Sequence, residues 1–233
     1  MRVYLLTHTP EPDSLVAAAA RLCYSDIAAC ALLQKESQAL SVRLLKELRQ
    51  SGHHSPFEHA SFTFGVDGLS RVASHQLVRH RIASFSQQSQ RYVKIGDDKG
   101  SEGMVMPPSV AEKPEAAELF MRQAEDACNV YKKLVSMGVP AEDARFILPH
   151  GWETSLVLTM NARELHHFFS LRLCRRAQWE IRELARLMLL ECRNAAPVIF
   201  DTAGPPCVTG ECRESRSCGR PYNSMEDFFA KDE

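Results

Sequence analysis

Hydrophobic residues recur along the chain with two spacings, and each spacing predicts one kind of element. Strands are expected where apolar residues form a short run or alternate with polar ones, at residues 3–7, 60–68 and 154–161. Helices are expected where apolar residues recur every three or four positions, at residues 15–25, 37–50, 69–80, 113–138, 140–149, 162–174 and 177–193. Because strands and helices mix without regular alternation, the pattern predicts an α+β fold with a mixed or antiparallel sheet packed with several long helices.

Local motifs refine this picture. In "SPFEH", Ser55, Pro56 and Glu58 take the N-cap, first-turn and N3 positions, which predicts a capping box. The stretch "RHRIASFSQQSQRY" at 79–92 is expected to form a loop, and "DDKGSEG" at 97–103 a surface turn. The end of the chain is rich in proline, glycine, cysteine and charge. We therefore expect one domain over residues 1–198 and an irregular tail over 199–233.

The composition is that of an ordinary soluble globular protein. Of the 233 residues, 45% are hydrophobic and 24% charged, and the formal net charge of −1 gives no bulk reason to expect a nucleic-acid or membrane partner. No export signal is recognised, and no apolar stretch approaches the roughly 18 residues that a membrane span requires. The cysteines are therefore interpreted as reduced thiols of a cytoplasmic protein.

One window of the sequence departs from this average. Between Asp67 and Asp97 there is no acidic residue, whereas five basic side chains give the window a local charge of +5. These are Arg71, Arg79, Arg81, Arg91 and Lys94. Guanidinium groups and the neighbouring serine hydroxyls are donors suited to phosphate, so the window favours a phosphorylated small molecule as ligand. Two alternatives stay open. The window is a solvent-exposed surface whose basic side chains pair with carboxylates from elsewhere in the fold, or it binds single-stranded RNA by charge and by stacking on Phe85 and Tyr92.

Two clusters raise the question of a metal. "GHHSPFEH" contains histidines and a glutamate, but their order does not match zinc motifs of the HExxH type. In the tail, Cys207, Cys212 and Cys218 are spaced by five and six residues without a CxxC pair. We expect no metal, and we keep these three thiols as an optional zinc or redox site beside the alternative of a plain tail.

A further candidate segment is "NARELHHFFSLRLC". Four residues apart, Arg163 and His167 share a helix face, whereas Arg163 and Arg172 point to opposite sides at about 100° per residue. If both arginines contact small ligands, they serve different sites or Arg163 precedes the helix.

Four motifs together resemble the flavin-dependent thymidylate synthases. "RHRIASFSQQSQR" fits the family signature of RHR, seven residues and a serine. "GHHSPFEH", "RFILP" and "NARELHHFFSLR" occur in the family's order and at its approximate separations. The similarity thus extends over about residues 52–193.

The resemblance implies an activity and its cofactors. It implies a homotetramer with sites shared between subunits, which binds FAD and converts dUMP to dTMP. The one-carbon donor is 5,10-methylenetetrahydrofolate, and NADPH is the reductant through FAD. No cysteine lies in the signature loop, so a cysteine adduct at uracil C6 is not the obvious route, and the resemblance implies a reaction without a cysteine nucleophile. The alternative hypothesis is a non-catalytic protein that binds phosphate ligands or single-stranded RNA through the patch from Arg79 to Arg91.

The resemblance also assigns residues. Arg172 and Ser89 match catalytic positions, Arg172 as the cation that favours the N3-deprotonated uracil. Positions matching dUMP contacts are Gln76, Arg79, Gln87, Gln88, Ser89, Gln90, Arg91, Arg145 and Arg172, of which Arg145 comes from a neighbouring subunit. Positions matching FAD contacts are Ser55, Arg79, His80, Arg81, Gln87, Asn161, Arg163 and His167. The chain departs from the family at Ser86 and Gln87, where many members carry Asn and Glu.

Overall fold

The computed structural model describes residues 1–35, 38–94, 103–212 and 214–230. These residues divide into two compact units. Unit 1 comprises Met1–Arg2, Val66–Arg79 and Phe85–Val157, and unit 2 comprises Val3–Gly65, His80–Ser84 and Leu158–Glu233. No helix within the described ranges is both long enough and apolar enough to cross a membrane.

Four strands form one sheet in the order β1-β2-β4-β3. They are β1 Arg2–His8, β2 Ser61–Ser70, β3 Ala83–Gln87 and β4 Glu153–Asn161. The hydroxyls of Thr63 and Thr159 lie 2.9 Å apart, and the amide of Arg71, directly after β2, donates to the carbonyl of Trp152 at 3.0 Å. Residue numbers rise along β2 while they fall along β4, so the two strands are antiparallel. The predicted α+β fold with an antiparallel sheet is confirmed.

The signature stretch contains a strand where we expected a loop. The sheet pairing of β3 continues beyond its end, since the amide of Gln88 donates to the carbonyl of Ser155 at 2.9 Å. Its side chains alternate between half-buried and exposed, and none is fully buried. Because β3 is the edge of the sheet, it needs no apolar face, and the hydrophobic pattern gave no sign of it.

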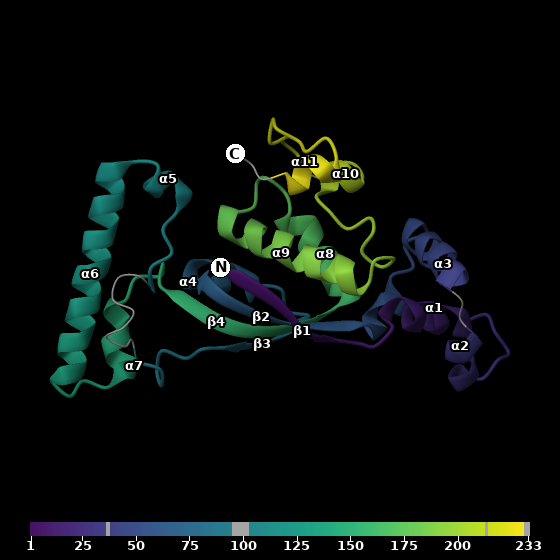
Figure 1. Cartoon of the computed structure of the whole chain (residues 1–233), viewed down its shortest axis with the longest axis horizontal. Helices are drawn as coiled ribbons and strands as arrows, with labels where there is room; N and C mark the ends of the chain where they lie inside the picture. Colours follow the sequence, from purple (N-terminus) through teal and green to yellow (C-terminus); the bar gives the residue numbers. More distant parts are fainter. Residues whose placement is uncertain (36–37, 95–102, 213, 231–233) are drawn as a thin grey trace. The chain divides into compact units, whose positions relative to one another are not determined.

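Unit 2 holds most of the helices around an aromatic core. Its helical elements are α1 Pro12–Leu22, α2 Ala29–Lys35, α3 Gln38–Gln50, the 3₁₀ helix η1 Ser55–His59, α8 Ala162–Arg172, α9 Trp179–Ala195, α10 Pro206–Thr209 and α11 Met225–Phe229. Helix α8 packs beside α9, and α1 packs against α2, α3 and η1 (Figure 1). The ring of Phe200 meets those of Phe62 and Phe169 edge-on at 5.3 and 6.0 Å.

The ends of unit 2 are tied to each other and to α9. The carboxylate of Asp13, in the first turn of α1, accepts from the amides of Val198 and Ile199 at 3.2 and 2.9 Å. In the tail, the two short helices α10 and α11 replace part of the expected irregular structure. The guanidinium of Arg193 in α9 lies 5.2 Å from the ring centroid of Phe229 in α11, and this cation–π contact attaches the tail to α9.

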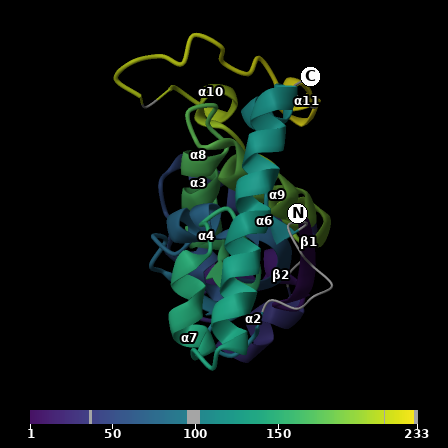
Figure 2. The same ribbon diagram turned by 90° about the vertical axis from the view of Figure 1, so that its left-hand side faces the viewer.

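Unit 1 is built around one long helix. Its helices are α4 Arg71–Leu77, α5 Pro108–Ala111, α6 Pro114–Ser136, α7 Ala141–Ala144 and the 3₁₀ turn η3 Arg145–Ile147. Figure 2 shows α6 in front with α7 alongside, and their contact buries Tyr131, Ala144 and Leu148. Gly138 has a φ of 88°, which ends α6 as its position after the apolar pattern indicated.

Several expected details are wrong. Helix α2 was not foreseen, α4 is shorter than residues 69–80, and residues 140–149 form α7 followed by a 3₁₀ turn. The predicted capping box is absent, because His54 precedes η1 and no side chain caps it. Glu58 instead forms an ion pair with Arg163. The surface turn expected at 97–103 lies outside the described residues apart from Gly103.

Candidate functional site

In unit 1, two of the predicted nucleotide-binding arginines meet at Glu142. Arg91 places Nε and Nη2 each 2.8 Å from Oε2 of Glu142. Arg145, just beyond α7, donates through Nε to the backbone carbonyl of the same glutamate at 3.0 Å. The Arg91–Glu142 pair is about half exposed, so it is a weak bond that a phosphate group can replace.

The signature loop orders the side chains around this cluster. Ser89 accepts the amide of Arg91 at 3.2 Å, which places a hydroxyl beside that arginine. Gln87 donates to the hydroxyls of Ser74 and Thr154 at 3.2 and 3.3 Å, so it fastens the end of β3. Gln76 lies in the last turn of α4, and Arg79 follows that helix closely.

Two buried donors in unit 1 lack a hydrogen-bond partner among the described residues. They are Nε2 of Gln90 and Nη1 of Arg71. Burial lowers the pKa of the Arg71 guanidinium, and the positive charge of Arg145 lowers it further. Buried donors are almost always satisfied in native proteins, so this pair points to a ligand acceptor. Gln90 was among the predicted residues. Arg71 was counted only toward the charge of the window, and that acid-free window was the signal that could have assigned it to the site.

In unit 2, three of the predicted flavin-binding residues line one cavity of about 640 Å³. Asn161, Arg163 and His167 come from the end of β4 and from α8. The face shared by Arg163 and His167 is as the helical spacing predicted. The other lining residues are Arg49, His54, Phe57, Glu58, Ile82, Glu164, His166 and Ser170.

The chemistry of this cavity fits a flavin dinucleotide. Asn161 caps α8, because its Oδ1 accepts the amide of Glu164 at 2.9 Å. The positive end of the helix dipole thus faces the cavity beside Arg163, and both favour a phosphate. Phe57 and Ile82 supply apolar walls for a ring system. Two other predicted flavin contacts, Ser55 and Arg81, are exposed.

Arg172 is held by a buried relay in unit 2. Its Nε donates to Nε2 of His80 at 3.0 Å, and Nδ1 of His80 lies 3.2 Å from Oε1 of Glu164. Arginine only donates, so Nε2 of His80 is the acceptor. The ring proton is therefore on Nδ1, and Nδ1–H donates a hydrogen bond to Oε1 of Glu164. Burial lowers the pKa of His80 to about 4, helped by Arg172 and His167, and the ring is therefore neutral at pH 7.

This relay gives His80 a different role from the FAD contact that the family resemblance implies. Both of its ring nitrogens serve groups of the same chain, and its edge packs on Phe168 at 4.9 Å. It orients the arginine predicted to be catalytic, which sequence reasoning did not foresee. Glu164 was also missed, since a glutamate in the first turn of a helix is usually a solvent-exposed partner of the dipole.

His166 has a structural role. It is wedged between Phe57 and Phe200, with ring centroids 5.9 and 5.1 Å away, and its Nε2 lies 3.0 Å from the carbonyl of Ile199. Burial, and then the charge of Arg49, lower its pKa to about 3. A neutral ring that donates Nε2–H to this carbonyl ties α8 to the segment after α9.

The histidine and cysteine clusters bear on the metal alternative. Within the described ranges, no three or more histidine, cysteine or acidic side chains are grouped so as to hold an ion. All eight cysteines are free thiols, including Cys207, Cys212 and Cys218.

The sequence and the fold have clear relatives. A model of the family described as thymidylate synthase complementing protein matches residues 4–198. The flavin-dependent thymidylate synthase of Geobacter sulfurreducens is 51% identical over 221 residues, which is 94% of each chain. The corresponding protein of Clostridium tetani is 42% identical over 94% of each chain.

A solved structure agrees. The crystal structure of a UMP/dUMP methylase from Streptomyces cacaoi, bound with 5-Br dUMP, matches with a TM-score of 0.73 at 28% identity and covers 86% of this chain and 93% of that one. None of these relatives supports the alternative of a non-catalytic RNA-binding protein. The chain belongs to the family of flavin-dependent thymidylate synthases.

Proposed function

We propose that this protein converts dUMP to dTMP, with 5,10-methylenetetrahydrofolate as one-carbon donor and NADPH as reductant through FAD. The observation that carries the proposal is the family match along most of the chain. When bound, FAD supplies the redox chemistry that no side chain of the protein provides. The residues of the chain bind the nucleotide and the flavin, orient them and polarise the uracil ring.

The first task is to hold the nucleotide phosphate. In this proposal Arg91 exchanges Glu142 for the phosphate, the hydroxyl of Ser89 adds a donor, and the Arg145 that contacts the nucleotide comes from a neighbouring subunit, as the family resemblance implies. Guanidinium forks suit this exchange, because they bind phosphate oxygens in pairs. Gln76, Arg79, Gln87, Gln88 and Gln90 would complete the nucleotide contacts.

The second task is to activate the uracil ring. Arg172 stays charged at any working pH, so it stabilises the ring deprotonated at N3 and makes C5 electron-rich. Neutral His80 accepts from Nε of Arg172 and adds no competing positive charge beside it. The one-carbon unit then bonds to C5 as its bond to the folate nitrogen breaks, and the C5 proton is released to solvent without a thiol adduct. The hydride that reduces the unit to a methyl group would come from NADPH through FAD.

The third task is to hold the flavin. Asn161, Arg163 and His167 would contact it from the cavity of unit 2, with Glu58 releasing Arg163 when the ligand enters. Ser55, Arg79, His80, Arg81 and Gln87 complete the set that the family resemblance proposes. The relay at His80 favours an indirect part for that residue, through Arg172.

The proposal includes a homotetramer with shared sites in the cytoplasm. Phe146 is 86% exposed directly after Arg145, and the proposal places this ring against another subunit. Free thiols throughout the chain are consistent with a reducing compartment.

A tritium-release assay tests the activity. Purified protein should be yellow, and it should release label from C5-tritiated dUMP only when NADPH and the folate are both present. Arg172→Ala should abolish the release and the rescue of a thymidine-requiring cell, while the native protein rescues. A colourless protein that cannot be loaded with FAD, and that instead binds oligonucleotides regardless of dUMP, contradicts the proposal.

A further inference from the structure

We call the cavity of about 640 Å³ in unit 2 the flavin-matching cavity. Two more cavities of unit 2 follow it in a row, and each shares lining residues with the one before. A cavity of about 140 Å³ shares His167 and Ser170 with the flavin-matching cavity. The same small cavity shares Arg175, Arg176, Ser217 and Cys218 with a third cavity of about 440 Å³. The end of α8 and the segment after it therefore form one wall that runs past all three.

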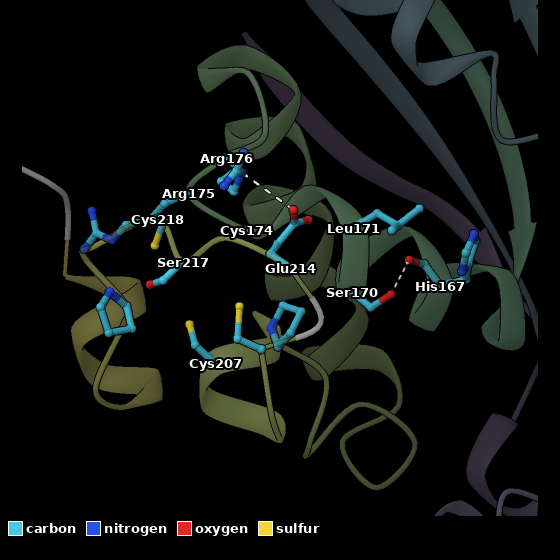
Figure 3. Close-up of a pocket in the computed structure, with 13 residues that line it drawn as sticks. His167, Ser170, Leu171, Cys174, Arg175, Arg176, Cys207, Glu214, Ser217 and Cys218 are labelled. Atoms are coloured by element: carbon cyan, nitrogen blue, oxygen red, sulfur yellow. Dashed lines mark hydrogen bonds and ion pairs between the residues drawn. The ribbon is translucent and has the colours of Figure 1, made fainter.

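The third cavity, which we call the arginine cavity, is strongly cationic. Its lining contains four arginines and no carboxylate, and comprises Arg175, Arg176, Arg216, Ser217, Cys218 and Arg220. Glu214 lies on the neighbouring small cavity, 3.6 Å from Nε of Arg176 (Figure 3). In the part of the chain that the structure describes, no carboxylate forms an ion pair with the side chain of Arg216 or Arg220.

The backbone and an aromatic ring hold this cluster together. Arg176 donates to the carbonyl of Arg216 at 2.6 Å, and the guanidinium of Arg175 stacks on Tyr222 at 3.9 Å. Tyr222 is itself buried against Phe228 of α11, with ring centroids 5.2 Å apart. Four like charges held in one cavity repel one another, and a ligand with several carboxylates or phosphates removes that repulsion.

The middle cavity suits a single aromatic ring. Its walls include Leu171, Pro206, Pro221 and the thiols of four cysteines, of which Cys207 and Cys218 are drawn facing it in Figure 3. Thiols that are neither paired nor bound to metal behave as small, soft apolar groups. A dry cavity of about 150 Å³ is known to accept benzene, so about 140 Å³ is room for one ring and no more.

We propose that the arginine cavity binds the glutamate tail of the folate co-substrate, and that the small cavity holds its aminobenzoyl ring. This inference rests on the proposed function. A folate consists of a bicyclic pterin, one aromatic ring and one or more glutamates in that order. The cavities run in the same order: the pterin would lie at the flavin-matching cavity together with the flavin, the aromatic ring in the small cavity, and the glutamates in the arginine cavity. The ligand class is thus a folate with several glutamates.

The test compares binding of folate monoglutamate and folate pentaglutamate to the FAD-loaded native protein. We expect the pentaglutamate to bind roughly tenfold more tightly, which corresponds to the few exposed charge pairs that the arginines offer. Arg216→Ala with Arg220→Ala should remove most of this difference, and Arg216→Glu with Arg220→Glu should reverse it. As a matched control, Arg122→Ala with Lys133→Ala removes two exposed charges from α6 of unit 1 and should keep the native difference.

Two outcomes overturn the inference. One is equal affinity of the native protein for the two folates. The other is a double variant that loses affinity for NADPH but not for NADH, with its folate preference intact, because the cavity would then serve the nicotinamide phosphate. Tritium release on the same preparation separates the two proposals. Native protein that forms dTMP without a glutamate preference contradicts only this inference, whereas absence of dTMP formation contradicts the proposed function.

Discussion

At the scale of single residues, His80 decides where Arg172 points. We expect His80→Ala to lower the rate of dUMP turnover at least tenfold, because the guanidinium loses the acceptor that fixes its plane. Flavin content, measured by absorbance, should stay near the native level. A direct flavin contact at His80 would instead lower the flavin content first.

A double-mutant cycle sharpens this prediction. If His80 acts through Arg172, the variant carrying both His80→Ala and Arg172→Ala should be no slower than Arg172→Ala alone. Additive losses of rate would show that His80 works independently of that arginine.

Arg71 is predicted to lower the stability of the ligand-free protein and to raise its affinity for dUMP. Its Nη1 is buried without a partner among the described residues, a state that costs roughly 1–3 kcal/mol. Arg71→Met should therefore raise the melting temperature of the ligand-free protein while it weakens dUMP binding about tenfold. Arg122→Met, an exposed change on α6, should alter neither, and a ligand-free protein destabilised by Arg71→Met would contradict this reading.

At the scale of elements, Asn161 joins a structural role to a proposed functional one. Its Oδ1 caps α8 while its side chain faces the cavity of unit 2. Asn161→Ala should cost about 1 kcal/mol of unfolding free energy and lower FAD affinity. Asn161→Asp keeps the acceptor, so it should keep the stability, but it brings a negative charge to the phosphate and should still weaken FAD.

Ser70 offers the matched control for that measurement. It caps α4 in unit 1 through the same kind of bond, from the amide of Ala73 to its Oγ at 3.1 Å. Ser70→Ala should lower the melting temperature by a similar amount with no change in FAD affinity. Loss of flavin in both alanine variants would indicate a general effect of instability.

Elements with a strong periodic pattern could be predicted from the sequence. The alternation in β2 and β4 and the long stripe of α6 reflect one buried face each, which is the signal that periodicity detects. Edge strand β3 buries no full side chain, and η1 is only five residues long, so neither leaves such a signal. The sequence placed Glu58 in a capping box or a metal cluster, and only the fold could show that its partner is Arg163.

The candidate site was predictable where spacing along a helix decides it. Arg163 and His167 line one cavity because four residues make about one turn. The relay of Arg172, His80 and Glu164 joins residues 84 and 92 positions apart, and no local pattern reports such a contact. The meeting of Arg91 and Arg145 at Glu142 escaped prediction for the same reason.

For the molecule as a whole, two buried histidines make stability depend on pH. The pKa values of His80 and His166 are lowered to about 4 and about 3, because burial disfavours their charged forms. Below the ordinary value of 6.5 the unfolded chain binds protons that the folded chain refuses, so the free energy of unfolding falls as pH falls. From pH 7 to pH 4 the loss should reach roughly 3 kcal/mol for His80 alone.

Urea unfolding at several pH values measures this dependence. His166→Gln keeps a donor for the Ile199 carbonyl but does not titrate, so it should flatten the slope between pH 6.5 and 5. The comparison uses this interval because burial raises the carboxyl pKa values of Asp13 and Glu164. Protonation of these two carboxyls at lower pH stabilises the folded chain and opposes the effect of the histidines. An unchanged slope in the variant would contradict the assignment.

Assembly is tested at Phe146. The native protein should elute with a mass of about 105 kDa, four times that of the 26.2 kDa chain. Phe146→Asp should shift it toward smaller species, because a charge replaces a ring that is exposed in the single chain and buried in the proposed tetramer. Lys133→Asp on α6 serves as the control for added charge, and a Phe146→Asp variant of unchanged mass would place the interface elsewhere.

The bond between Asp13 and the segment after α9 also sets an order for biosynthesis. The carboxylate and its two amide donors are 185 and 186 residues apart, in a chain of 233. Helix α1 leaves the ribosome early, but its first turn stays without these donors until residue 199 has been made. Unit 2 therefore closes only after residue 199 has left the ribosome, and the aromatic core around Phe200 stays unassembled, and open to chaperones, until then.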